Sequence, residues 1–186
     1  METKTTILGF AGSLRKGSFN RSLLRAALEM VPKDANLVTF DLEGIPPFNQ
    51  DLEGQPPEKV KEFKAQIRSA DAILIATPEY NYSIPGVLKN AIDWASRPHG
   101  DNAFEGKPAA LMGASIGMLG TARAQYHLRQ SLVFLDLYPL NKPEVMVPFA
   151  SDKVDTEGRL TDPKTREKIK ELLEALVAWT KRLKMD

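Results

Sequence analysis

The chain has 186 residues, with 25 Lys and Arg against 24 Asp and Glu, and it contains no cysteine. This length is close to one average domain, so we expect a single domain spanning residues 1–186. A net charge of +1 argues against a nucleic-acid binder with a broad basic face. Without cysteine the chain has no disulfides, thiolate nucleophile or iron–sulfur cluster, and with only two histidines no metal centre is predicted. The chemistry must therefore come from a serine, from carboxylates or from a bound cofactor.

The chain shows no sequence feature of membrane insertion or export. Its first residues lack the basic start and apolar core of a signal peptide. The longest strictly apolar run covers residues 72–76, far short of the ~18 residues that indicate a membrane span. We therefore expect a cytoplasmic protein that does not enter a membrane.

Strand-like and helix-like segments alternate along the whole chain. Strands are predicted at residues 5–10, 35–42, 72–76, 108–114 and 145–147. Helices are predicted at 21–30 with Asn20 as N-cap, at 58–68, 87–95 and 120–136, and after an N-cap at Asp162. The continuous apolar run 72–76 is typical of a strand covered on both faces. This alternation predicts an α/β fold, a doubly wound five-stranded parallel sheet with helices on both faces.

In such sheets ligands bind beyond the carboxyl ends of the strands, so the loops there are expected to carry the site. The loop after the first strand offers the hydroxyls of Ser13 and Ser18, the guanidinium of Arg15 and the amide of Asn20. It leads into a helix N-terminus, where free N–H groups and the helix dipole favour an anion. These donors suit a phosphate monoester. The alternative is a solvated loop whose Ser and Asn only cap the helix.

The loop after the third strand runs from Thr77 to Gly86 and carries two prolines, two tyrosines and an asparagine. A stiff loop with aromatic faces and exposed backbone amides is suited to hold a flat heteroaromatic ring. The alternative is a turn whose tyrosines only cover the end of the core.

The loop after the fourth strand carries three glycines, Gly113, Gly117 and Gly120, which let a ligand approach the backbone. The same stretch matches GxSxG, with Ser115 as the candidate nucleophile of a hydrolase. That reading needs an acid and then a histidine downstream. His127 is the only downstream histidine and no acid lies between it and Ser115, so the hydrolase is the weaker alternative.

In the strand order 2-1-3-4-5 the first, third and fourth strands are neighbours, so their three loops meet at one crevice. A loop suited to phosphate, an aromatic loop and a glycine loop together indicate a mononucleotide with a large planar ring. FMN fits this description, and the flavodoxin-like order holds FMN at this switch point. We therefore predict a flavodoxin-like fold that binds FMN.

The residues of these loops resemble those of the NAD(P)H-dependent FMN reductase family, the flavodoxin-like group of quinone, azo-dye and chromate reductases. The resemblance rests on residues 12–15 with Ser18 and Asn20, on residues 77–81, and on residues 85–86 with 89–94. The resemblance covers nearly the whole chain. It implies that three groups of residues bind the cofactor. These are Ser13, Arg15, Ser18, Phe19 and Asn20 around the phosphate; Pro78, Glu79, Tyr80, Asn81, Tyr82 and Ser83 along the ring; and Ser115 and Gly117 in the loop after the fourth strand.

The resemblance also implies an activity and an assembly. NAD(P)H passes a hydride to tightly bound FMN, and two electrons then reach a small acceptor: a quinone, a flavin, an azo compound or a metal ion such as chromate. No catalytic acid or base is assigned, because the flavin carries the chemistry. The family implies a homodimer or homotetramer, and Arg123, Tyr126 and Glu144 are candidates for a polar contact across the interface or for a merely solvated surface. A flavodoxin-type electron carrier is the alternative, although such carriers are usually acidic.

Overall fold

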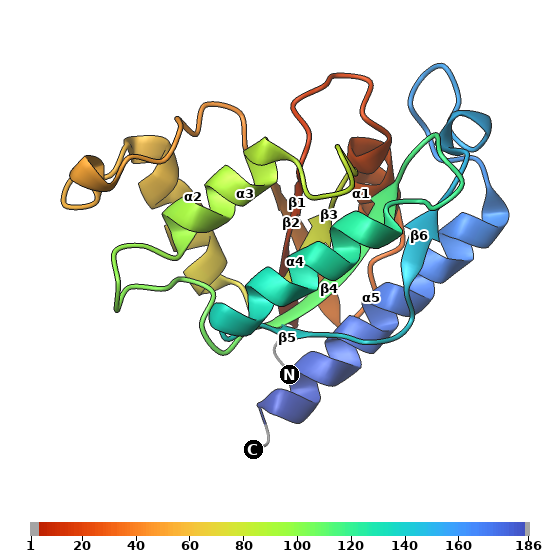
Figure 1. The fold of residues 1–186 in the computed structure, drawn as a ribbon. Helices are drawn as coiled ribbons and strands as arrows, with labels where there is room; N and C mark the ends of the chain where they lie inside the picture. The colour runs from red at the N-terminus through yellow and green to blue at the C-terminus, as the bar shows by residue number, and fades with distance from the viewer. Residues whose placement is uncertain (1–3, 185–186) are drawn as a thin grey trace.

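One parallel sheet runs through this computed structural model, which describes residues 4–184. Its strands are β1 (Thr5–Ala11), β2 (Ala35–Phe40), β3 (Ala72–Ala76), β4 (Pro108–Ala114), β5 (Tyr138–Pro139) and β6 (Val145–Val147). The helices of the described residues are α1 (Phe19–Glu29), α2 (Glu58–Ser69), α3 (Gly86–Ala95), α4 (Ala122–Phe134) and α5 (Pro163–Leu183), with short 3₁₀ turns η1 (Gln50–Leu52) and η2 (Ala150–Asp152). The strand order β2-β1-β3-β4-β5 confirms the predicted topology (Figure 1).

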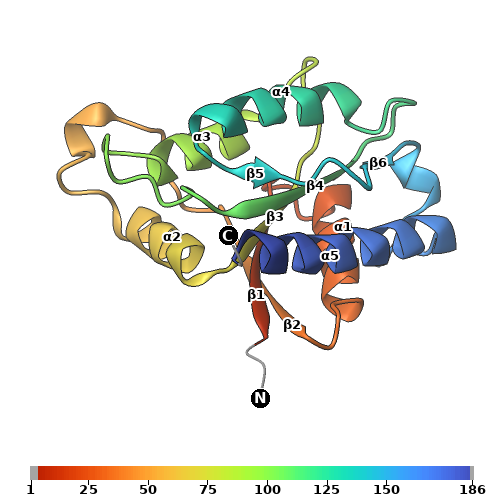
Figure 2. The ribbon, with the colours of Figure 1, turned by 90° about the horizontal axis from the view of Figure 1, so that it is seen from below.

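The helices form two layers, one on each face of the sheet (Figure 2). Helices α1 and α5 pack on one face through a core that includes Leu23, Ile169 and Leu173. Helices α2, α3 and α4 cover the other face through a second core that includes Phe63 and Leu128. The five residues of β3 are all buried, as the continuous apolar run predicts for a strand covered on both sides.

Side chains of the central strands alternate between the two cores, as the two-residue period of a strand requires. In β3, Leu74 faces α1 and α5 while Ile73 and Ile75 face the other layer. The face toward α1 has small residues, and Gly9 is the extreme case. A Cβ there would lie 2.7 Å from Leu24 Cδ1, so α1 lies close against β1 because Gly9 has no side chain.

The structure corrects several predicted element boundaries. Helix α1 begins at Phe19 rather than Arg21, and its N-cap is Ser18, not Asn20, because the Ser18 hydroxyl accepts from the Arg21 N–H. Helix α4 covers Ala122–Phe134 rather than 120–136, since Gly120, Thr121 and Asp136 all have positive φ. Strand β2 ends at Phe40, two residues early, where its pairing with β1 ends. The predicted N-cap Asp162 is confirmed.

The fifth position of the sheet is shared by two short strands. The predicted strand at 145–147 is β6, which pairs with residues 112–114 of β4. Strand β5, which the sequence pattern does not indicate, pairs with Pro108 and Ala109 at the other end of β4. The two lie along the same edge of β4, and the chain between them leaves the sheet. Strand β6 therefore supports the carboxyl end of β4, where the third loop begins.

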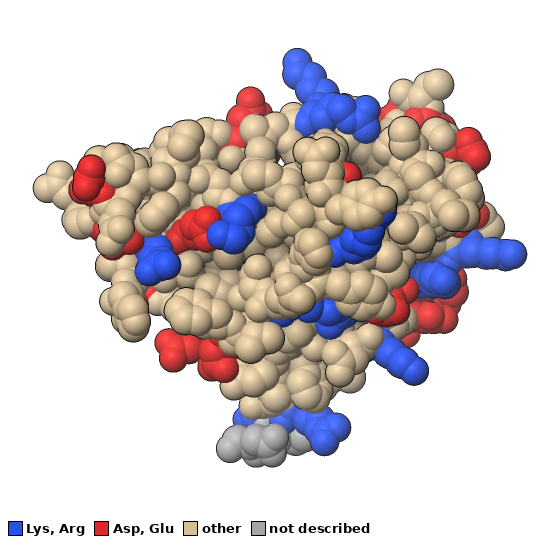
Figure 3. All heavy atoms as spheres, viewed as in Figure 1, with Lys and Arg blue, Asp and Glu red and all other residues tan. Residues whose placement is uncertain are grey.

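Charges of both signs are interspersed on the face shown in Figure 3, with uncharged surface between them. Among the described residues no helix is long and apolar enough to cross a bilayer. The same part of the chain contains no group of three or more His, Asp or Glu side chains placed to hold a metal ion.

Candidate functional site

The three loops predicted to meet do meet, around a pocket of about 310 Å³ at the carboxyl edge of the sheet. They are called here the first loop (residues 12–18, after β1), the second loop (residues 77–85, after β3) and the third loop (residues 115–121, after β4). Nine predicted site residues line the pocket: Ser13, Arg15, Ser18, Phe19, Asn20, Pro78, Glu79, Tyr80 and Ser115. The volume lies at the lower end of the usual range for small-molecule sites, roughly 300–1,000 Å³.

The first loop brings donors to the N-terminus of α1. The side chains of Ser13 and Ser18 are buried, whereas Arg15 is exposed with its guanidinium 5.1 Å from the centre of the Phe19 ring. Within residues 4–184 no ion pair uses Arg15, and the first N–H groups of a helix have no partner inside it. This corner of the pocket therefore presents a free cation, two hydroxyls and helix N–H groups, which together suit a phosphate.

Asn20, in the first turn of α1, joins this helix to the end of β4, where the third loop begins. Its Nδ2 donates to the Ala114 carbonyl at 3.0 Å, and its Oδ1 accepts from the Ala114 N–H at 2.9 Å. Both ends of the amide are thus used to hold α1 against the end of β4. Asn20 lines the pocket, but in this structure its side chain is a bridge between two walls rather than a free donor.

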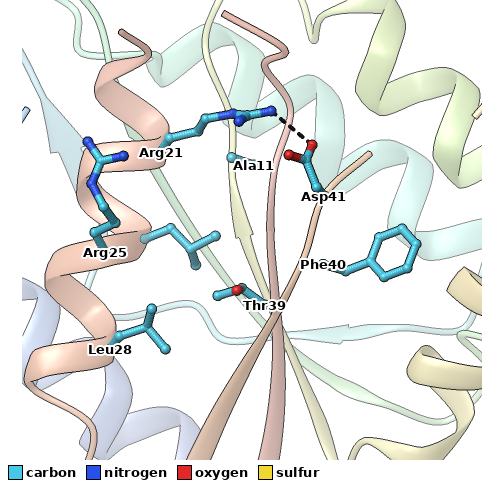
Figure 4. Close-up of a pocket in the computed structure, with 8 residues that line it drawn as sticks. Ala11, Arg21, Arg25, Leu28, Thr39, Phe40 and Asp41 are labelled. Atoms are coloured by element: carbon cyan, nitrogen blue, oxygen red, sulfur yellow. Dashed lines mark hydrogen bonds and ion pairs between the residues drawn. The ribbon is translucent and has the colours of Figure 1, made fainter. Parts of the chain in front are cut away.

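Arg21 holds the first loop from behind. Its Nε donates to the Ser13 carbonyl at 2.9 Å, and its guanidinium pairs with Asp41 at 2.8 Å. Figure 4 shows this pair spanning the space between α1 and the chain just after β2. Arg21 is not among the predicted site residues, although a basic residue in the first turn of a helix after a Ser-rich loop is a signal that could have identified it.

The middle of the second loop is a tight hairpin. Tyr80 and Ser83 exchange backbone hydrogen bonds of 3.0 and 2.9 Å, and the residues between them, Asn81 and Tyr82, have φ values of 49° and 68°. Two successive positive φ values are the geometry of a type I′ turn, which usually carries Asn or Gly. A tyrosine in this conformation is strained, and such strain persists only where neighbours hold it.

Helix α4 supplies those neighbours. The Arg123 guanidinium lies 3.5 Å from the centre of the Tyr82 ring and pairs with Glu79 at 2.5 Å. One turn later, His127 Nδ1 lies 3.1 Å from Ser83 Oγ. Glu79 also accepts from the Ala124 N–H at 3.2 Å, which makes its buried carboxylate a cap for α4. The hairpin is therefore fixed to α4 by three side chains of the second loop.

This arrangement changes the predicted use of several residues. Tyr80 lines the pocket, whereas Tyr82 turns to Arg123, and Asn81, Tyr82, Ser83 and Gly117 are not among its lining residues. Of the backbone N–H groups predicted to face a ring, that of Tyr80 is taken by Ser83. Arg123 does not join Tyr126 and Glu144, which form their own 3.2 Å hydrogen bond within the same chain.

The glycines near the third loop serve different purposes. A Cβ on Gly113 would lie 2.0 Å from Thr121 Oγ1 and 2.5 Å from the Thr77 carbonyl oxygen. Gly120 has a φ of 54°, and a Cβ there would meet the backbone of residues 146–148 at 2.8 Å. A Cβ on Gly117 would meet only Ser115 Oγ, at an ordinary contact distance of 3.8 Å. Gly113 and Gly120 therefore serve packing, and only Gly117 suits the predicted approach of a ligand.

The serine hydrolase alternative has no geometric support. Ser115 Oγ donates to the Gly117 carbonyl at 3.3 Å, while His127 is engaged with Ser83. The pocket includes two residues that sequence reasoning missed, Ala114 and Ile116, which flank Ser115. Ile116 is 69% exposed, and an apolar side chain beside a predicted ligand loop is the signal that could have identified it.

The residues present fit FMN. The pocket has a cationic and hydroxyl-rich end in the first loop and an apolar or aromatic end made by Pro78, Tyr80 and Ile116. A phosphate and a planar ring need these two environments, and α1 directs its N-terminus at the first of them. A phosphate would be held by Ser13, Arg15 and Ser18.

Comparisons with known proteins agree with this geometry. Residues 5–152 match the family model described as NADPH-dependent FMN reductase. The chain belongs to this family. It is 55% identical to an NAD(P)H-dependent FMN reductase of Pseudomonas aeruginosa, covering 99% of this chain and 100% of that one. It is 42% identical to a 2-hydroxy-1,4-benzoquinone reductase of Burkholderia sp., covering 91% and 93%.

A solved structure shows the same fold. The flavoenzyme NAD(P)H:(acceptor) oxidoreductase of Paracoccus denitrificans superimposes with a TM-score of 0.87 at 36% identity, covering 96% of this chain and 98% of that chain. The protein is thus an NAD(P)H-dependent flavin oxidoreductase with FMN as its cofactor. This membership confirms the predicted enzyme class and sets aside the electron-carrier and hydrolase alternatives.

Proposed function

We propose that this FMN reductase transfers the reducing equivalents of NAD(P)H to quinones, as NAD(P)H + H⁺ + quinone → NAD(P)⁺ + quinol. The observation that carries the proposal is the pocket at the carboxyl edge of the sheet, with a phosphate-binding end and an aromatic end on neighbouring loops. Relatives that bear the names 2-hydroxy-1,4-benzoquinone reductase and NAD(P)H:quinone oxidoreductase, at 42% and 47% identity, support the choice of acceptor.

FMN, when bound, supplies a ring that takes a hydride and releases two electrons. The protein's own contribution is to bind and orient. Ser13, Arg15 and Ser18 would hold the phosphate, and Pro78 and Tyr80 would line the ring, while Arg123 holds the adjacent hairpin, whose tip carries the backbone N–H groups of Asn81 and Tyr82. Backbone N–H groups fixed near the ring would stabilise negative charge on its reduced form without reorganisation.

A spectrum and a turnover assay test the proposal. Purified protein is expected to show flavin absorbance and to release FMN on denaturation. It is expected to oxidise NADH or NADPH rapidly only when a quinone is added. Rapid NAD(P)H oxidation with no preference for quinones over free flavin would contradict the proposed acceptor, and a protein that cannot be loaded with FMN would contradict the whole reading. Azo compounds and chromate are further proposed acceptors to include in the same panel.

We also propose that the enzyme acts as a homodimer or homotetramer. Helix α4 carries three large apolar side chains toward solvent: Tyr126, Val133 and Phe134, exposed by 52%, 79% and 80%. Exposed apolar side chains grouped in this way are typical of interaction surfaces. Light scattering on wild type and on Phe134→Asp is expected to show a larger assembly that the variant weakens; a wild-type monomer would contradict the proposal.

A further inference from the structure

A second pocket lies beside the flavin site and is almost entirely apolar. It has a volume of about 290 Å³ and is called here the aliphatic groove; its walls include Leu14, Leu42, Ile45, Pro47, Gly86 and Val87. Leu14 is 43% exposed in a loop that is otherwise polar. Of the described residues that line the groove none is charged. The groove therefore offers nothing to a phosphate and suits a hydrocarbon group.

The one amide in the wall is held by hydrogen bonds at both of its ends. Asn90 Oδ1 accepts from the Phe48 N–H at 2.7 Å, and its Nδ2 donates to the Pro46 carbonyl at 2.8 Å. Trp94 Nε1 donates to the same carbonyl at 2.8 Å, and its ring contacts Phe48 edge-on. Asn90 and Trp94 thus hold the chain after β2 in place as a preformed wall. Because this wall is already ordered, little free energy is lost in ordering it when a ligand binds.

The aliphatic groove and the flavin pocket share their dividing wall. Leu14 lines the groove, while its neighbours Ser13 and Arg15 line the flavin pocket. The second loop lines the flavin pocket from Pro78 to Tyr80 and ends at Pro85, next to Gly86 in the groove. The first loop lies directly on the start of α3, since a Cβ on Gly12 would be 3.0 Å from Leu88 Cβ. A molecule whose reactive end is at the flavin can therefore extend a side arm into the groove.

The pocket in Figure 4 offers a contrast. It lies between α1 and β2, has a volume of about 170 Å³ and includes Arg21, Arg25 and Asp41. Its charges are already used, because Arg21 pairs with Asp41 and Arg25 donates to the Gly158 carbonyl at 2.8 Å. It has neither free charge for a polar ligand nor an uncharged lining for an apolar one.

We propose that the aliphatic groove binds the hydrocarbon substituent of the acceptor, so that the enzyme prefers alkyl- or prenyl-substituted quinones to unsubstituted ones. This inference rests on the proposed quinone reductase function and adds a substrate class to it. The quinone head would accept the electrons at the flavin, while the substituent replaces water against Leu14, Ile45 and Val87. Removing apolar surface from water is the source of the preference.

The experiment compares two quinones of matched head group on the FMN-loaded enzyme. One is 2,3-dimethoxy-5-methyl-1,4-benzoquinone and the other is the same quinone with one isoprenyl group on its free ring carbon. Burial of the apolar carbons is expected to lower the KM of the prenylated quinone by about tenfold. Turnover of both quinones with the same KM would overturn the groove alone, whereas turnover of neither would overturn the quinone reductase function as well.

Substitutions at Gly86 test whether the difference in KM between the two quinones arises in the aliphatic groove. A Cβ there meets nothing within 4 Å, and Gly86 is the first residue of α3, where an acidic side chain favours the helix. Gly86→Asp and Gly86→Leu, which charge or fill the groove, are expected to reduce the KM ratio from about ten to about one. Gly54, equally open but outside the groove, gives the matched controls Gly54→Asp and Gly54→Leu, expected to keep the wild-type ratio. A ratio that survives both Gly86 variants would overturn the proposal.

Discussion

The two loops that form most of the flavin pocket are held in different ways. The first loop has support from the helix that follows it: Ser18 caps α1, and Arg21 in the first turn donates back to the Ser13 carbonyl. The second loop has a strained tip held from a distant helix, through Arg123 and His127 of α4. The end of the pocket that suits the phosphate therefore has contacts close in sequence to support it. The end that suits the ring depends on packing between distant segments, such as Glu79 and Arg123, which are 44 residues apart.

The largest expected effect comes from the glycine beneath the ring end. Gly113→Ala would place a Cβ 2.0 Å from Thr121 Oγ1 and 2.5 Å from the Thr77 carbonyl, forcing apart the starts of the second loop and of α4. Overpacking of this kind costs about 3 kcal/mol of unfolding free energy. Urea unfolding measures it. In the control Gly117→Ala the new Cβ would make only an ordinary 3.8 Å contact with Ser115 Oγ, so its free energy of unfolding should stay within about 0.5 kcal/mol of wild type. Equal losses of stability in the two variants would contradict the overpacking at Gly113.

The variant Arg123→Ala tests whether the two ends of the pocket act independently. Arg123→Ala leaves the buried Glu79 carboxylate without its cation and Tyr82 without its cover, which is expected to cost about 2 kcal/mol of stability. The flavin spectrum and kcat should change while the contribution of the phosphate group to FMN binding stays the same. Affinities for FMN and for riboflavin measure that contribution. If Arg123→Ala changed only the contribution of the phosphate group to FMN binding, the assignment of the second loop to the ring would be wrong.

Arg15→Ala is the complementary test. It removes a charge-assisted contact to phosphate but no ion pair within residues 4–184, so FMN affinity is expected to fall about tenfold. Riboflavin, which lacks the phosphate, should bind as it does to wild type, and the urea midpoint should not move. Unchanged FMN affinity would remove Arg15 from the site.

The smallest effect compares two helix caps. Ser18→Ala and Asp162→Ala each remove an N-cap and are expected to cost about 1 kcal/mol, but only Ser18→Ala should also weaken FMN. The hydroxyl of Thr165 donates to Asp162 and lowers the pKa of that carboxyl below its ordinary 3.8. The Asp162 contribution is therefore complete above about pH 4 and is lost as the pH falls through the lowered value. Unfolding at pH 7 and pH 3 should show the difference between Asp162→Ala and wild type shrinking in acid; a constant difference would contradict it.

Local patterns in the sequence predicted much of this protein. The apolar run 72–76, the N-cap at Asp162 and the predicted helix ranges depend on the spacing of apolar side chains and on the residues at helix ends, which neighbours in sequence supply. They predicted the alternation of strands and helices, and the flavodoxin-like order expected for that alternation is the one observed. The composition of three loops, with the family resemblance, predicted nine of the residues that line the pocket. The errors fall where local signals compete: Asn20 and Ser18 are both good caps, and only the contact of Asn20 with Ala114 decides between them.

Only the tertiary structure showed which partners the loop residues contact. Nothing near Tyr82 in sequence shows that its ring lies under Arg123, and nothing near Gly113 shows that Thr77 and Thr121 close over it. The aliphatic groove is likewise made by residues from three separate segments, none distinctive alone. The physical reason is one of range. The spacing of apolar side chains and the capping of helices act within a few residues, whereas the role of a side chain in the site depends on which distant groups bury it and pair with it.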